Sequence, residues 1–74
     1  MENRQAKAMK NTIKIERAKM DITQDELAKL VGVSRQTINA IELGKYVPST
    51  TLALKLSKLF KVTVNEIFCL DEEE

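Results

Sequence analysis

The chain has 74 residues, no histidine, one cysteine and a formal net charge of +1. A lone cysteine forms no internal disulfide, so we expect a protein of the reducing cytoplasm. Because the chain also has no histidine, we expect no metal site, and no cofactor is expected. No apolar run approaches the ~20 residues that span a bilayer, so no membrane partner is expected. Catalysis is not expected either, because histidine and phosphate-binding glycine loops are missing.

The two ends of the chain differ in charge from the segment between them. Residues 1–10 lack apolar periodicity, and we expect a flexible N-terminal arm whose basic side chains contact phosphates or are simply solvated. Residues 71–74 form an acidic tail with four of the eleven acids, so the rest carries twelve bases against seven acids. Residues 11–70 are the expected domain, and its surplus of bases suits an anionic partner.

Asn11 or Thr12 can cap a first helix that reaches about Met20. Ile13, Arg17 and Met20 follow helical spacing, which places Arg17 on the apolar face. A buried arginine is costly unless it is paired, so a partner carboxylate is expected. The alternative is that Arg17 runs along the surface with its charged end in water.

Residues 23–44 organise the rest of the chain. Thr23 and Glu26 have the spacing of a capping box, which predicts the start of a helix. Gly32 interrupts that helix, because glycine adopts positive φ without steric cost. Ser34 is a second N-cap, before a helix expected over residues 35–43.

The helix after Ser34 has two chemically different faces. At about 100° per residue, Ile38 and Ile41 fall together on one side. The other side and its flank carry side chains that suit base edges in the major groove, where arginine matches guanine and glutamine or asparagine matches adenine. These are Arg35, Gln36 and Asn39, and the small Ala40 would let the helix sit close to the groove floor. A generic helical hairpin remains the alternative interpretation.

The segment after Gly44 predicts a loop and two more helices. Lys45 and Tyr46 suit phosphate contacts, although Tyr46 can equally pack on the core edge. A fourth helix follows Ser49 or Thr50, and a short fifth helix follows Thr63; we expect no strand. The C-terminal end carries more apolar surface than one small chain can bury, which predicts a homodimer. The expected interface is Leu54, Val64, Ile67, Phe68 and Leu70.

The chain resembles helix-turn-helix regulators of the Cro and phage-repressor type, the XRE family. The residues that carry the resemblance are Thr23-Gln24, Leu27-Ala28, Gly32-Val33-Ser34, Ile38 and Ile41-Glu42-x-Gly44-Lys45. The resemblance extends from Arg17 to Phe68. It implies an all-α, compact five-helix phage-repressor-like domain from a bacterium, an archaeon or a phage. It also implies that Arg17 pairs with Glu42 and that Gln24 holds a phosphate.

The expected function is sequence-specific binding of double-stranded DNA, as a repressor that occupies a palindromic operator as a dimer. No small-molecule ligand is expected, since the chain has no room for a sensing domain. The alternative is a protein-interaction module, such as an antitoxin-like protein that neutralises a partner. The expected DNA contacts are Gln24, Ser34, Arg35, Gln36, Thr37, Asn39, Ala40, Lys45 and Tyr46.

Overall fold

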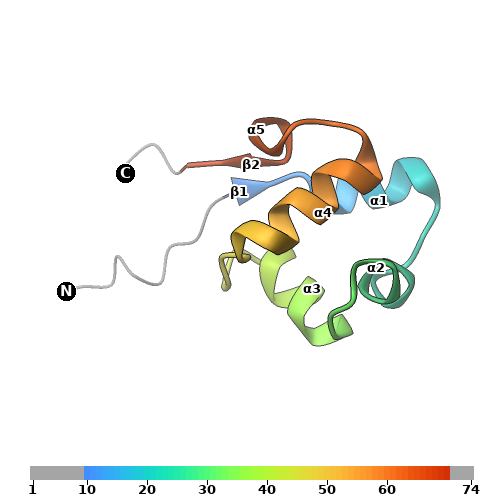
Figure 1. Ribbon diagram of the computed structural model, residues 1–74. Helices are drawn as coiled ribbons and strands as arrows, with labels where there is room; N and C mark the ends of the chain where they lie inside the picture. The colour runs from blue at the N-terminus through green and yellow to red at the C-terminus, as the bar shows by residue number, and fades with distance from the viewer. Residues whose placement is uncertain (1–9, 71–74) are drawn as a thin grey trace.

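The computed structural model describes residues 10–70, and the predicted five-helix architecture is confirmed (Figure 1). The predicted arm, apart from Lys10, and the acidic tail lie outside the described residues. In chain order the elements are β1 (Lys10–Asn11), α1 (Ile13–Met20), α2 (Gln24–Val31), α3 (Arg35–Glu42), α4 (Thr50–Phe60), α5 (Val64–Ile67) and β2 (Phe68–Cys69).

Side-chain caps start four of the five helices, largely where the sequence predicts them. In the capping box of α2, Thr23 Oγ1 accepts from the backbone N–H of Glu26 at 3.0 Å, and Glu26 Oε1 accepts from that of Thr23 at 2.8 Å. Ser34 and Ser49 each accept one backbone N–H of the helix that follows. These bonds satisfy donors that a helix start leaves without an intrahelical partner.

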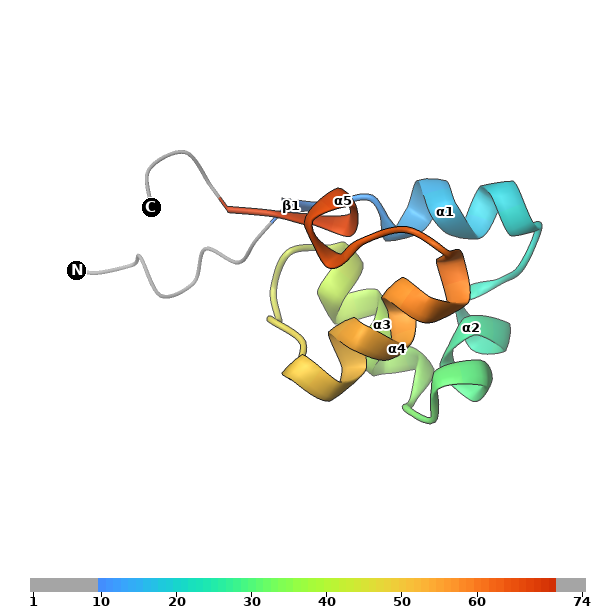
Figure 2. The ribbon, with the colours of Figure 1, turned by 45° about the horizontal axis from the view of Figure 1, so that its top comes forward.

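The core lies where all five helices meet, with α4 running through the middle of the molecule and α1 above it in Figure 2. The largest fully buried side chains come from every helix: Ile13, Leu27, Ile38, Ile41, Leu56 and Ile67. The expectation that Met20 shares the apolar face of α1 is wrong, because Met20 is 41% exposed. The helix ends there, and Asp21 turns the chain away with a φ of +58°.

A short antiparallel ladder joins the two ends of the described chain, so the expectation of no strand is wrong. Lys10 pairs with Cys69 and Asn11 with Phe68. Asn11 also connects the ladder to the helices. Its Nδ2 donates to the carbonyl of Ile41 at 2.8 Å, and its Oδ1 accepts from the N–H of Ile13 at 3.2 Å. The C-terminal end of α3 is therefore held by the ladder as well as by its apolar face.

Candidate nucleic-acid interface

The turn between α2 and α3 sets the direction of α3. Gly32 has a φ of +80°, and the N–H groups of Gly32 and Val33 both donate to the carbonyl of Ala28, at 2.8 and 3.0 Å. Ile38 and Ile41 then insert into the core, with 0% and 1% of their surface exposed. The opposite side of α3 consequently faces solvent, and it carries the exposed side chains Arg35 and Gln36.

An ion pair behind α3 links three parts of the chain. Arg17 Nε donates to Glu42 Oε2 at 2.7 Å, and Arg17 Nη2 donates to Glu42 Oε1 at 3.2 Å. Arg17 Nη1 donates to the carbonyl of Ile22 at 3.0 Å, just before α2. The two charged side chains are only 15% and 8% exposed. The bidentate contact with Glu42 and the bond to Ile22 together fix α1, the start of α2 and the end of α3 relative to one another.

Gln24 extends the ion pair toward the exposed side of α3. Its Nε2 donates to Glu42 Oε1 and to Asn39 Oδ1, both at 3.1 Å. The sequence predicts a phosphate contact for Gln24 and a base contact for Asn39, but it does not predict the bond between the two side chains. The two residues are 15 positions apart in the sequence, and no local pattern signals their contact, which exists only because α2 and α3 pack together.

Ser34 and Thr37 lie together at the start of α3. Their hydroxyl oxygens are 3.0 Å apart, and Ser34 Oγ accepts the backbone N–H of Thr37 at 3.1 Å. Since one hydroxyl donates to the other, one hydroxyl hydrogen of the pair is left for an outside acceptor. Ala40 is partly buried on the flank of α3.

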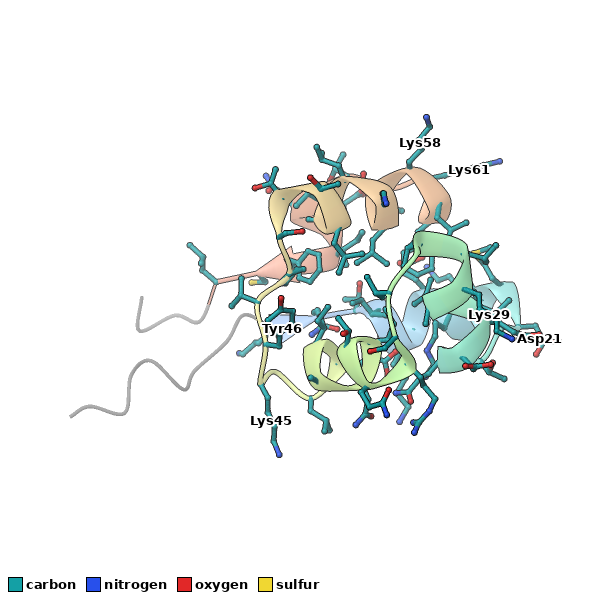
Figure 3. All side chains as sticks on the ribbon, turned by 60° about the horizontal axis from the view of Figure 1, so that its bottom comes forward. Asp21, Lys29, Lys45, Tyr46, Lys58 and Lys61 are labelled. Carbon is teal, nitrogen blue, oxygen red and sulfur yellow. The ribbon has the colours of Figure 1, made fainter. Side chains whose placement is uncertain are left out.

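The loop after α3 carries the remaining predicted contacts. Figure 3 shows Lys45 extending away from the body on the α3 side, whereas Lys58 and Lys61 extend from the end of α4 on the opposite side. Tyr46 is 50% exposed, so its ring is shared between the core edge and solvent. Lys45 therefore lies on the same side of the molecule as the exposed face of α3.

The side chains predicted to form a dimer interface divide into two groups. Leu54 and Leu70 are 58% and 65% exposed, and Val64 is partly buried. Ile67 is 1% exposed and Phe68 is 7% exposed, so both pack in the core of their own chain. The prediction that Ile67 belongs to the interface is therefore wrong, because a side chain that is 1% exposed offers almost no surface to a partner. Phe68 retains one edge on a groove that also borders Leu54 and Leu70.

The capped helix pair, the glycine turn and the exposed polar face of α3 define a DNA-binding helix-turn-helix protein. Comparison with known proteins agrees, since residues 13–67 match the helix-turn-helix family HTH_3. The chain belongs to this family, in its Cro/C1 or XRE type. It is a DNA-binding transcriptional regulator, and its family and relatives place it outside the enzymes.

Relatives of nearly the same length support the assignment. An uncharacterised HTH-type transcriptional regulator of Methanocaldococcus jannaschii is 53% identical over 89% of this chain and 100% of its own. YgzD of Bacillus subtilis, also an uncharacterised HTH-type transcriptional regulator, is 49% identical over 88% of this chain and 98% of its own.

One solved structure shares the fold. It is the crystal structure of a Bacteroides fragilis protein that is provisionally described as DNA-binding. Its sequence is 30% identical to this chain, and the TM-score between the two structures is 0.72. The similarity covers 82% of this chain and 98% of that one. Within residues 10–70, no helix is both long and apolar enough to cross a membrane.

Replacing Arg17 by alanine is expected to destabilise the protein by about 3 kcal/mol, because Glu42 would be left largely buried without its cation. The value lies at the low end for such a change, since Glu42 keeps its bond from Gln24. Urea unfolding of the purified variant measures the effect.

The matched control for Arg17 is Lys19→Ala. Lys19 also pairs with a carboxylate, Glu16 at 3.6 Å, but its side chain is 66% exposed. Its loss should cost no more than about 0.5 kcal/mol. Equal stability of the Arg17→Ala and Lys19→Ala variants would contradict a structural role for the ion pair.

Proposed function

We propose that this regulator is a cytoplasmic repressor that binds a palindromic operator as a homodimer and reads it with α3. The observation that carries the proposal is the exposed polar face of α3, which is held from behind by the ion pair of Arg17 and Glu42. A rigidly placed helix can present its side chains to base edges in a fixed register. A protein that occupies an operator represses transcription by blocking that site, and this action requires no domain besides the one that binds DNA.

The proposed contacts fall into two sets. Base edges are contacted by Arg35, Gln36, Asn39 and Ala40, on the helix that enters the major groove. Phosphates are contacted from the two ends of the motif: by Gln24 at the start of α2, by the hydroxyl pair of Ser34 and Thr37, and by Lys45 and Tyr46 in the loop after α3. Phosphate contacts position the protein, whereas base contacts specify the sequence.

Selection of bound sites from random DNA by the purified protein tests the base-reading set. The wild-type protein is expected to enrich one sequence. Gln36→Ala should cost about 1–3 kcal/mol on that sequence and relax the choice at one base pair, because a bidentate contact is lost. Arg35→Ala should do the same at a different base pair. If both folded variants still select the wild-type site with wild-type preference, α3 does not read the bases.

Lys45→Ala is expected to weaken binding to all sequences alike and to lower the slope of log affinity against log salt by about one unit. The reason is that a phosphate contact releases counterions whatever the base sequence. Titrations at several salt concentrations measure the slope. Lys58→Ala removes the same charge from the opposite side of the molecule (Figure 3), and it should leave the slope unchanged. Equal effects of the two changes would contradict a phosphate contact at Lys45.

The proposed homodimer uses an apolar groove between the loop after α3, α4 and the C-terminal end. The groove has a volume of about 810 Å³. Its lining includes Val47, Ala53, Leu54, Val64, Phe68 and Leu70. Three of these side chains are about half exposed or more, at 49% for Val47, 58% for Leu54 and 65% for Leu70. We propose a second copy as the occupant, because a twofold axis here would offer two α3 helices to one DNA face, about 34–36 Å apart.

Leu54→Glu is expected to convert the dimer into a monomer, because it would bury a charge without a partner at the centre of the interface. Sedimentation velocity at micromolar concentration distinguishes the two states. Leu30→Glu is the control: Leu30 is equally exposed, at 60%, but lies on α2 outside the groove. A wild-type protein that sediments as a monomer and binds single half-sites would refute the dimer.

The alternative of an antitoxin-like module is less well supported. A face that binds a protein partner is typically built around aromatic or aliphatic anchors. The exposed positions Arg35 and Gln36 at the start of α3 are polar instead.

A further inference from the structure

We propose that Asn11 is a positioning residue for the DNA interface. Its side-chain amide holds the turn at the end of α3 and so sets where Lys45 meets a phosphate. This inference rests on the proposed phosphate contact of Lys45, and it names the residue that keeps that contact in place. Asn11 acts through the backbone of α3 rather than by touching DNA.

The turn after α3 is a Schellman motif, in which a glycine with positive φ ends the helix. Gly44 has a φ of +76°, and its N–H donates to the carbonyl of Ile41 at 2.9 Å. The N–H of Lys45 donates to the carbonyl of Ala40, also at 2.9 Å. The backbone of Lys45 is therefore part of the turn, so its position relative to the start of α3 depends on how the helix ends.

Asn11 bonds to the same turn from outside it. Its Nδ2 donates to the carbonyl of Ile41 at 2.8 Å, across 30 positions of sequence. A carbonyl oxygen has two lone pairs, and here one accepts from Gly44 and the other from Asn11. The amide thus ties the last turn of α3 to β1, a link that the turn alone does not make.

β1 and α1 give the Asn11 amide a fixed place and orientation. Asn11 pairs with Phe68 in the ladder, and the N–H of Thr12 donates to the carbonyl of Ile67 at 2.9 Å. Asn11 Oδ1 accepts from the N–H of Ile13 at 3.2 Å. Turning the amide over would set its NH₂ group against that N–H and its oxygen against the carbonyl of α3. The nitrogen of the amide therefore faces α3.

The loop that follows the turn depends on it for its position. Among residues 10–70, no backbone hydrogen bond involves Tyr46, Val47 or Pro48. Lys45 is thus placed by the turn, and the turn by α3 and Asn11. Without the bond from Asn11, the last carbonyls of α3 are held less firmly and Lys45 samples a wider range of positions. Binding to DNA would then have to order this segment, which reduces what Lys45 contributes.

Asn11→Ser tests this role. A serine hydroxyl can still accept from the N–H two residues on, as asparagine does, but it is too short to reach Ile41. The effect of Lys45→Ala is compared in the wild-type and Asn11→Ser backgrounds by DNA titrations at several salt concentrations. The slope of log affinity against log salt should fall by about one unit in the wild-type background and by about half a unit or less in the other. Base preference should stay unchanged, because Arg35 and Gln36 lie at the other end of α3.

Thr12→Ala is the matched control. Thr12 Oγ1 also donates to a backbone carbonyl in this part of the fold, that of Glu66 at 3.4 Å, but it makes no bond to α3. Lys45→Ala should keep its full effect in that background. Asn11→Asp is a second test variant, which keeps the acceptor for Ile13 and loses the donor. Its added charge cancels, because Lys45→Ala is compared within each background.

Amide hydrogen exchange is a second measurement, and it requires no DNA. The N–H groups of Gly44 and Lys45 should exchange several times faster in the Asn11→Ser protein than in the wild type. The N–H groups of Gly32 and Val33, which bond within the turn after α2, are the internal reference and should exchange at the wild-type rate.

The outcomes are distinct, with each variant checked by thermal unfolding. A reduced effect of Lys45→Ala in the Asn11 variants, together with its full effect in Thr12→Ala, supports the inference. A full effect in every background overturns it and leaves the proposed function intact. If Lys45→Ala has no effect in the wild-type protein, the proposed phosphate contact is wrong and the inference is lost with it.

Discussion

The ion pair of Arg17 and Glu42 is the contact on which the DNA-binding arrangement depends. Two largely buried charges are costly to desolvate, and they are offset only when geometry and neighbouring hydrogen bonds satisfy them. Here one guanidinium spans the Glu42 carboxylate and the carbonyl of Ile22, so it bonds α3 and the turn before α2 at once. Other relative positions of these helices would leave a charge without a partner. The pair thus acts on specificity of arrangement as well as on stability.

The same pair explains why one exposed face can be polar without weakening the fold. α3 is anchored by Ile38 and Ile41 on its inner side and by Glu42 at its end, and Asn11 holds the carbonyl of Ile41 from the ladder. These anchors leave Arg35 and Gln36 on the outer side of α3 exposed and without a packing role. Its residues can therefore be chosen for their hydrogen-bonding groups, as base reading requires.

The sequence predicted most of what is determined locally. The caps of α2, α3 and α5 depend on residues three apart, and the turn at Gly32 depends on one backbone conformation, so both leave a pattern in the chain. The ladder does not, because strands of two residues show no periodicity and their partners are far apart in sequence. The contact of Gln24 with Asn39 is missed for the same reason.

The errors about single residues have a common cause. A helical wheel ranks side chains by direction, but burial also depends on where a helix ends and what lies across from it. Met20 has the direction of Ile13 yet sits on the last turn of α1, where little packs against it. Ile67 has the apolar character expected of an interface, yet it ends α5 and packs into the core of its own chain.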